Sequence, residues 1–221
     1  MASFAHMIHR SRTNLLKNLA KSDYKVGSFE DTDMSTIQTM YMNKNPNLLN
    51  MLVHREDGAR AFVQYFLHVG NPQKPISAFK NNNLLDIIDN HRARTDYEGG
   101  PFNAEIDTIV VVIPNEVNDT VQKMITQVWE ESAVFVVVFS LAELQFCVLE
   151  HEYVPRHEPL KEEEKAVVYK RFSITRDSNL PEIGRFDPAA KAVLLRPNQL
   201  CKIHRASRTA IIDEHYYRLC V

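Results

Sequence analysis

The sequence predicts an α/β N-terminal domain over residues 1–150 and a small α+β module with a mixed sheet over residues 151–221. Two β-branched runs, at 106–113 and 134–139, flank a helical pattern. A strand, a helix and a strand at this spacing form a crossover unit with a largely parallel sheet. At His151 a proline-punctuated segment begins, and the remaining residues read as about 70 residues of mixed helix and strand.

Spacing and capping predict the helices that precede the first of these runs. A second helix begins near Met34, because the preceding residues from Asp31 to Asp33 offer N-cap oxygens, and Pro46 interrupts its pattern. The basic N-terminus lacks the apolar core of a presequence and fits an ordinary first helix better. The apolar residues of that first helix recur at helical spacing: Ile8, Leu15, Leu16 and Leu19.

The middle of the N-terminal domain alternates strand and helix. Residues 59–69 are rich in aromatic and β-branched residues and predict a strand, which a turn at 70–72 ends. A helix over 76–92 and a polar loop over 93–104 follow. The apolar side of that helix consists of Ile76, Phe79, Leu84, Ile87 and Ile88.

The run at 106–113 predicts a strand covered on both faces, which Pro114 ends. A helix from about Asn118 to Glu131 follows it. The segments 134–139 and 144–149 predict two further strands. The helix over about 118–131 has an apolar stripe that consists of Val121, Ile125, Val128 and Trp129.

The C-terminal module begins with an extended link over 151–160. A short helix at 161–172 carries glutamates in its first turn, where they suit the helix dipole. A second short helix begins at Pro188, because proline is well tolerated at the first helical position and Asp187 can cap it. Residues 199–206 and 214–221 predict two terminal strands.

Composition excludes several classes of protein. The net charge of -2 gives no whole-molecule field toward nucleic acid or membrane, and no apolar run reaches the length of about 18 residues that a membrane helix needs. Three widely spaced cysteines argue against a disulfide framework and for a reducing compartment. With 6 glycines in 221 residues, the chain lacks the glycine-rich loop of a Rossmann or P-loop enzyme.

Two candidate catalytic or metal sites are weaker than their structural alternatives. Cys147, Cys201 and three histidines, at 151, 157 and 204, lack the paired short spacing of structural zinc. Glu163 and Lys165 form an E-x-K element that one nuclease superfamily uses with Mg²⁺. A solvated helical face explains that element better. We therefore expect no catalytic residue, cofactor or metal, although the nuclease alternative would recruit an upstream carboxylate from Asp86, Asp89 or Asp107.

The segment 202–209 is locally basic and adds two hydroxyls. Such groups suit phosphate or carboxylate contacts, while a solvated surface loop is the alternative that charge alone leaves open.

Five short motifs follow one another in the last third of the chain: HEYVPRH (151–157), LPEI (180–183), DPAAKA (187–192), LCKIHRASRTA (200–210) and HYYRLCV (215–221). Their order and gaps resemble the assembly module of the subunit shared by the nuclear RNA polymerases, a family that includes the H-type subunit of archaeal RNA polymerase. The resemblance is close over 151–221 and looser back to about Ile106.

The resemblance implies a subunit interface with the largest polymerase subunit. It also implies an N-terminal jaw with a nuclease-like fold and no active site, which lies near downstream DNA and has Asn115, Asn118 and Thr120 as its DNA-proximal residues. The implied interface residues are Val154, Pro155, His157, Leu180, Pro181, Ile183, Asp187, Pro188, Lys202, Arg205, Ser207, Thr209, Tyr217 and Arg218.

The chain departs from the family pattern at several positions. Leu194 and Asn198 stand where the family has glycines, which predicts a changed turn near 194 because leucine takes a left-handed backbone at a cost of about 1–2 kcal/mol. Acidic Glu116 and Asp119 in the jaw would repel phosphate. These changes suggest a specialised copy, either dedicated to one polymerase class or viral.

The sequence thus predicts a non-catalytic structural subunit of a multisubunit DNA-directed RNA polymerase, bound to the largest and other subunits and only weakly to downstream DNA, with no cofactor and no membrane. The expected location is the nucleus, the nucleolus for a ribosomal-RNA polymerase, or the virion or host cell for a viral copy. The alternatives are a Mg²⁺-dependent nuclease and a stand-alone DNA-binding module.

Overall fold

A computed structural model describes residues 4–43, 46–67, 79–205 and 214–221. The chain forms two compact units, Met1–Phe146 and Cys147–Val221. Each unit has its own mixed sheet and its own helices, in keeping with the α/β and α+β classes that the sequence predicts for them. None of the described helices is long and apolar enough to cross a bilayer.

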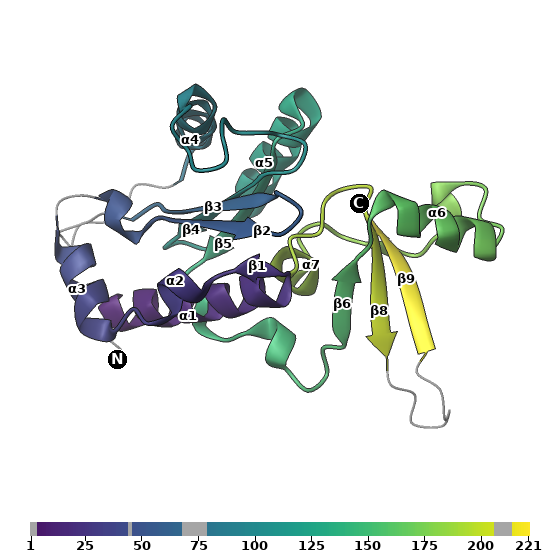
Figure 1. The fold of residues 1–221 in the computed structure, drawn as a ribbon, viewed down its shortest axis with the longest axis horizontal. Coiled ribbons are helices and arrows are strands. Elements are labelled where there is room, and N and C mark those ends of the chain that lie inside the picture. The colour runs from purple at the N-terminus through teal and green to yellow at the C-terminus, as the bar shows by residue number, and fades with distance from the viewer. Residues whose placement is uncertain (1–3, 44–45, 68–78, 206–213) are drawn as a thin grey trace. The chain divides into compact units, whose positions relative to one another are not determined.

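The N-terminal unit is built on a five-stranded sheet in the order β1-β2-β3-β4-β5 (Figure 1). The first two pairings are antiparallel and the last two are parallel, so the predicted parallel crossover is confirmed. Every residue of β4 and β5 is buried, which explains their unbroken apolar sequence. The strands are β1 (Tyr24–Lys25), β2 (Met51–Arg55), β3 (Arg60–Tyr65), β4 (Thr108–Ile113) and β5 (Phe135–Ser140).

Helices cover both faces of this sheet. Figure 1 shows α4 (Asn81–Ala93) and α5 (Asp119–Ser132) on one side and α1 (Phe4–Lys21) on the other. The short α2 (Gly27–Glu30) and α3 (Met34–Met42) contact α1. The cap predicted near Met34 is present, because the carboxylate of Asp33 accepts from the Thr36 N–H at 2.8 Å. The structure adds a cap for α5, where the amide oxygen of Asn118 accepts from the Val121 N–H at 3.1 Å.

Two sequence expectations for this unit need correction. Residues 144–149 are not a strand but lie in two 3-10 turns, η2 (Glu143–Gln145) and η3 (Val148–Glu150). The carboxylate of Glu143 accepts from the Ser140 N–H, and the Ser140 hydroxyl accepts from the Glu143 N–H, so the chain turns as soon as β5 ends. The sequence also does not predict β1 and β2, because polar residues interrupt their apolar pattern.

Some of the expected elements fall partly outside the described residues. The turn at 70–72 lies there entirely, and so does Ile76 at the expected start of α4. The described remainder of that helix buries Leu84, Ile87 and Ile88, as its spacing predicts.

The C-terminal unit has a four-stranded sheet in the order β6-β8-β9-β7 (Figure 1). Pairings β6–β8 and β8–β9 are antiparallel and β7–β9 is parallel. The expected extended link over 151–160 therefore contains an edge strand. The strands are β6 (Arg156–Pro159), β7 (Glu182–Ile183), β8 (Leu200–Arg205) and β9 (Glu214–Cys220).

Each face of this small sheet has its own apolar core. One core contains Val168 of α6 (Glu162–Arg171), and it includes Leu160, Leu180, Leu200 and Leu219. The other contains Ala190 of α7 (Pro188–Ala192), and it includes Ile183, Val193, Leu195, Cys201, Ile203 and Cys220. Because strand side chains alternate between faces, β8 contributes Leu200 to the first core and Cys201 to the second.

The two positions where the resembled family has glycine keep a left-handed backbone. Leu194 has φ 53° and Asn198 has φ 66°, a region that glycine enters at no steric cost. The expected change in the turn near 194 is therefore wrong: leucine takes the left-handed conformation, and its burial in the module offsets part of the strain.

Candidate docking site

The C-terminal unit carries an open groove of about 470 Å³ between its sheet and the segments that flank it. Seven residues that the sequence assigns to a subunit interface line this groove: Val154, Pro155, His157, Ile183, Asp187, Pro188 and Arg218. Four more lining residues are not part of that prediction: Val148, Tyr153, Ala189 and Ile203.

Strand register explains why distant motifs meet at this groove. His157 pairs with Ile203, and Arg218 pairs with Cys201, so these side chains share one face of the sheet. Ile203 is only 7% exposed and forms part of the apolar core beneath the groove. Sequence motifs from the beginning, the middle and the end of the module therefore contribute to one surface.

Hydrogen bonds fix the polar side chains around the groove. One carboxylate oxygen of Asp187 accepts from the N–H groups of Ala189 and Ala190, at 2.8 and 3.3 Å. His157 Nδ1 lies 2.7 Å from the carbonyl oxygen of Pro155, and Arg218 Nη1 donates to the carbonyl of Glu182 at 2.8 Å. These contacts are internal to the module, so the walls are organised before any partner binds.

The prolines restrict the backbone of the walls further. Pro155 and Pro188 fix their own φ angles and confine the preceding residues to extended conformations. Tyr153 projects at the rim with 76% of its surface exposed, which is unusual for a tyrosine beside an apolar groove. An apolar floor, a fixed polar edge and an exposed aromatic residue together suit a protein segment better than a small charged substrate.

The other predicted interface residues lie elsewhere. Leu180 is buried in the core beneath α6, and Pro181 is exposed just before β7. Lys202 and Tyr217 pair with each other on the sheet face opposite the groove. Arg205 is exposed at the end of β8, with its guanidinium carbon 5.9 Å from the centroid of the Tyr216 ring. Ser207 and Thr209 fall outside the described residues.

The residues predicted to lie near DNA sit in the N-terminal unit, in the segment after β4 and at the start of α5. Asn115 and Thr120 are exposed, while Asn118 uses its amide oxygen as the helix cap. Glu116 in the loop and Asp119 at the first position of α5 are exposed and make this region locally acidic. This loop therefore lacks the positive charge that phosphate contacts normally require.

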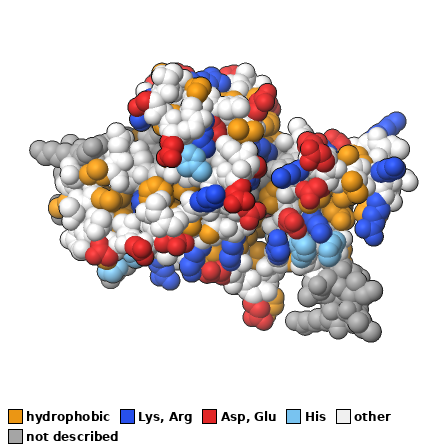
Figure 2. Space-filling view, viewed as in Figure 1, with side chains coloured by type: hydrophobic (Ala, Val, Ile, Leu, Met, Phe, Trp, Pro, Cys, Tyr) orange, Lys and Arg blue, Asp and Glu red, His pale blue; other side chains and the backbone are white. Residues whose placement is uncertain are grey.

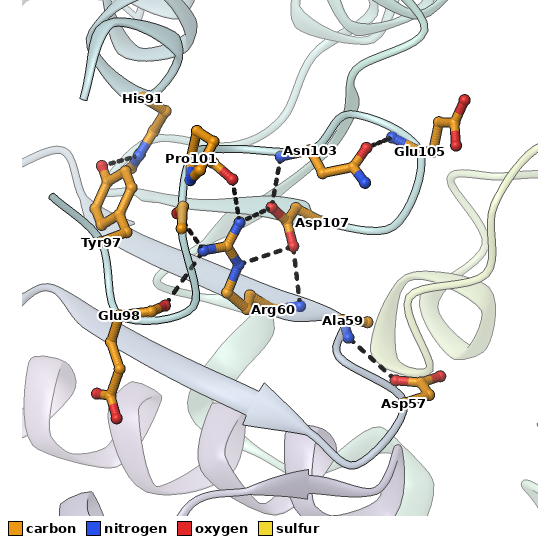
Figure 3. Close-up of polar contacts among 11 residues, drawn as sticks. Asp57, Ala59, Arg60, His91, Tyr97, Glu98, Pro101, Asn103, Glu105 and Asp107 are labelled. Atoms are coloured by element: carbon orange, nitrogen blue, oxygen red, sulfur yellow. Dashed lines mark hydrogen bonds and ion pairs between the residues drawn. The ribbon is translucent and has the colours of Figure 1, made fainter. Parts of the chain in front are cut away.

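The carboxylates that a Mg²⁺-dependent nuclease would need are not gathered in one site. Asp107 makes structural hydrogen bonds, and the others lie on exposed helix surfaces. Asp107 accepts from Arg60 at 2.6 and 3.1 Å and from two backbone N–H groups, those of Arg60 and Asn103 (Figure 3). Glu163 is exposed on α6, and the ammonium of Lys165 donates to the Asn198 carbonyl. Asp86 and Asp89 are exposed on α4.

The candidate zinc residues do not come together either. In the described part of the chain, no three His, Cys, Asp or Glu side chains are arranged to hold a metal ion. Cys147, Cys201 and Cys220 are buried and form no disulfide. Burial raises the pKa of the Cys201 thiol to about 12 and that of Cys220 to about 11, so both stay protonated at neutral pH.

The sequence of this module matches one protein family. The family model for the C-terminal domain of RNA polymerase Rpb5 matches residues 146–220. The DNA-directed RNA polymerase subunit Rpo5 of Pyrococcus horikoshii is 39% identical over 77 residues, which are 35% of this chain and 92% of that protein.

Eukaryotic relatives are matched over a smaller share of their own length. The RPABC1 subunit of RNA polymerases I, II and III from Caenorhabditis elegans is 44% identical over 72 residues, 33% of this chain and 34% of that protein. Its counterpart in Dictyostelium discoideum is 31% identical over 114 residues, 51% of this chain and 56% of that protein.

Proposed function

Because this chain belongs to the family of DNA-directed RNA polymerase subunits that includes Rpb5 and Rpo5, we propose that it docks on the largest polymerase subunit through the groove of its C-terminal unit. Its function is that of a subunit in a multisubunit RNA polymerase. We propose further that it is a structural subunit, without an active site of its own, and that catalysis belongs to the other chains.

The observation that carries the docking proposal is the convergence of three parts of the module on one groove. Val154 and Pro155 come from the first motif, Ile183 and Asp187 from the middle of the module, and Arg218 from the last strand. Residues with purely structural roles would be expected to disperse through the two cores. Their convergence on one surface supports a role in contact with another protein.

The internal rigidity of the groove supports a permanent interface. An interface that must order its side chains and loops on binding spends about 0.5–1.5 kcal/mol per immobilised side chain. The capped α7, the prolines and the bonds of His157 and Arg218 have already fixed these walls. Docking can therefore use most of the free energy gained when a partner covers the exposed rim of the groove, which includes Tyr153.

The N-terminal unit carries the remaining parts of the proposal. We propose that it is a jaw with a nuclease-like fold, held near downstream DNA, and that the acidic Glu116 and Asp119 weaken any contact through Asn115, Asn118 and Thr120. The departures from the family pattern support a copy dedicated to one polymerase class or to a virus. We also propose that the chain is equivalent to the archaeal H-type subunit. The eukaryotic relatives support a nuclear location for it.

A charge placed in the groove tests the docking proposal. In tagged full-length protein expressed in its own cells, Val154→Asp should abolish co-purification of the largest polymerase subunit. A buried, unpaired carboxylate costs several kcal/mol, and each 1.4 kcal/mol is about a tenfold loss in affinity. The measurement is quantitative mass spectrometry of the purified complex.

Val167→Asp is the matched control, because Val167 is 66% exposed on α6 and does not line the groove. It introduces the same change on the same module and should leave co-purification unaltered. Both variants should melt within a few degrees of the wild type. Normal recovery of the largest subunit with Val154→Asp would refute docking through this groove.

A further inference from the structure

A small pocket lies in the N-terminal unit, where α1 meets α2 and the residues that follow it. Its volume is about 180 Å³, below the roughly 300–1,000 Å³ of pockets that hold drug-sized ligands. The charged and imidazole side chains that line it are His9, Arg12, Lys17 and Glu30. Neither the docking groove nor the proposed function uses any of them.

Arg12 is the unusual member of this pocket. Its residue surface is only 4% exposed, and its Nε–H group is buried with no hydrogen-bond partner. Nη1 donates to the carbonyl of Leu49 at 2.7 Å, and the guanidinium carbon lies 5.6 Å from the centroid of the Phe29 ring. No carboxylate of the described residues pairs with it.

A buried guanidinium without a counter-ion is expensive. Leaving a buried charge unpaired costs several kcal/mol, so such groups are normally paired with a carboxylate or bind an anion. Arg60 in the same unit is paired with a carboxylate, that of Asp107. Burial also lowers the pKa of Arg12, which reflects the same unfavourable desolvation.

The rest of the pocket limits how strongly an anion could bind. Thr13 and Thr32 donate their hydroxyl protons to the carbonyls of His9 and Phe29, so these protons are not available to a ligand. Glu30 is exposed and contributes negative charge. On the face that Figure 2 shows, the surface around α1 to α3 carries acidic and basic side chains together rather than a basic patch. Any affinity must therefore come from the buried group itself.

We propose that this pocket binds a phosphate-sized oxyanion, with the buried guanidinium of Arg12 as the cationic donor and with His9 and Lys17 among the residues that line it. The planar guanidinium presents donors in a fixed fork that matches an oxyanion. The pocket is too small for a whole nucleotide. The source of the anion is either free phosphate or a phosphodiester of nucleic acid, since both present the same oxygens.

Titration calorimetry of the full-length chain with inorganic phosphate tests the proposal. Saturable binding in the millimolar range is expected for wild type, and Arg12→Met should abolish it. Arg10→Met removes an exposed guanidinium from the same helix without touching the pocket and should bind phosphate as the wild type does. Acetate and chloride at equal ionic strength should not give a saturable signal.

Glu30→Gln provides a variant that gains affinity, so that a folding defect cannot imitate the result. Removing one negative charge a few ångströms from the anion in a solvent-like dielectric should tighten phosphate binding by about threefold. If Arg12→Met does not fold, Arg12→Lys keeps the charge but loses the fork, and it should weaken binding while Glu30→Gln strengthens it.

A short DNA duplex at equal phosphate concentration distinguishes the two sources. Binding of inorganic phosphate would identify the ligand as a free oxyanion. Arg12-dependent binding of the duplex alone would identify it as a phosphodiester of nucleic acid. Either result supports the proposal that the pocket binds an oxyanion. Absence of both, or unchanged phosphate binding in Arg12→Met, would overturn the inference. The docking proposal would stand in that case, because none of these variants lies in the C-terminal unit.

Discussion

Arg60 and Asp107 form an ion pair whose side chains are 4% and 0% exposed. Arg60 also donates to the backbone carbonyls of Glu98, Gly100 and Pro101, so one guanidinium holds the loop between α4 and β4 against the sheet (Figure 3). The same geometry explains why a carboxylate beside a strand, which in a nuclease would bind metal, here has a structural role.

Removing one partner of this pair should be strongly destabilising. Asp107→Asn leaves the Arg60 charge buried without its counter-ion, and we expect a loss of about 3–5 kcal/mol in the free energy of unfolding, measured by urea denaturation. Asp96→Asn is the matched control, because Asp96 pairs with Arg94 at side-chain exposures of 70% and 57%, and its loss should leave the free energy of unfolding nearly unchanged.

A loss below about 1 kcal/mol for Asp107→Asn would contradict this account of the loop. The double variant Arg60→Met/Asp107→Leu should lose less than the two single variants together, because it leaves no charge unpaired.

His91 makes part of this unit sensitive to acid. Its Nδ1 lies 2.6 Å from the hydroxyl of Tyr97, its Nε2 is buried without a partner, and its ring packs 5.0 Å from that of Phe62. Burial, with a smaller effect from the charge of Arg94, lowers the pKa of His91 to about 4 from its usual 6.5. The folded protein therefore holds the ring neutral.

The direction of the pH dependence follows from proton binding. Between about pH 6.5 and 4 the unfolded chain binds a proton that the folded chain does not, so stability should fall by about 1–3 kcal/mol as the pH falls through this range. Urea denaturation at a series of pH values measures the slope. His91→Gln should flatten it, and an unchanged slope in that variant would assign the acid sensitivity to other groups.

At the scale of elements, the ends of helices carry local strain. The helix α5 ends at Ala133, which has φ 52° and donates its N–H to the Trp129 carbonyl at 2.9 Å. Glycine is the usual residue at such a left-handed cap, because any side chain there costs about 1–2 kcal/mol. Leu194 and Asn198 show the same substitution of a side chain for a glycine in the C-terminal unit.

Ala133→Gly should therefore stabilise the protein by about 1 kcal/mol, an unusual direction for a change to glycine. Ala133 is exposed, so little packing is lost. The same change at Ala166, exposed within α6, should instead cost about 1 kcal/mol, because its backbone is helical. Melting temperatures of the two variants should move in opposite directions; a shared direction would contradict the role of the cap.

The sequence predicts best those elements whose apolar residues recur without interruption at the spacing of a strand or a helix. The strands β4 and β5, the helix between them and the caps Asp33 and Asp187 all match. The strand predicted for 144–149 is wrong, because the chain turns as soon as β5 ends, and Phe146 stays 56% exposed rather than packing in a sheet. The strands β1 and β2 escape prediction, because β1 has two residues and β2 includes His54 and Arg55.

The candidate site is predictable to a different degree. The motifs identify seven of the groove residues, but strand alternation sends Lys202 and Tyr217 to the opposite face, which a linear motif does not reveal. Tyr153 and Ile203 can be assigned to the groove only once the register of β6, β8 and β9 is known. The unpartnered Nε of Arg12 carries no sequence signal, since it depends on what the fold leaves around it.

At the scale of the whole molecule, the chain separates a structured docking module from a larger α/β unit. The groove belongs entirely to the C-terminal unit, and the oxyanion pocket belongs entirely to the N-terminal unit. The two proposals can therefore be tested by variants that do not share a residue.

Hydrogen–deuterium exchange of this chain inside its purified polymerase, compared with the free chain, tests docking through the groove most directly. The account predicts that amides of 153–158 and 182–190 exchange at least about tenfold more slowly in the complex, while the exposed face of α6 is unchanged. Equal exchange rates for the groove segments in both states would contradict it.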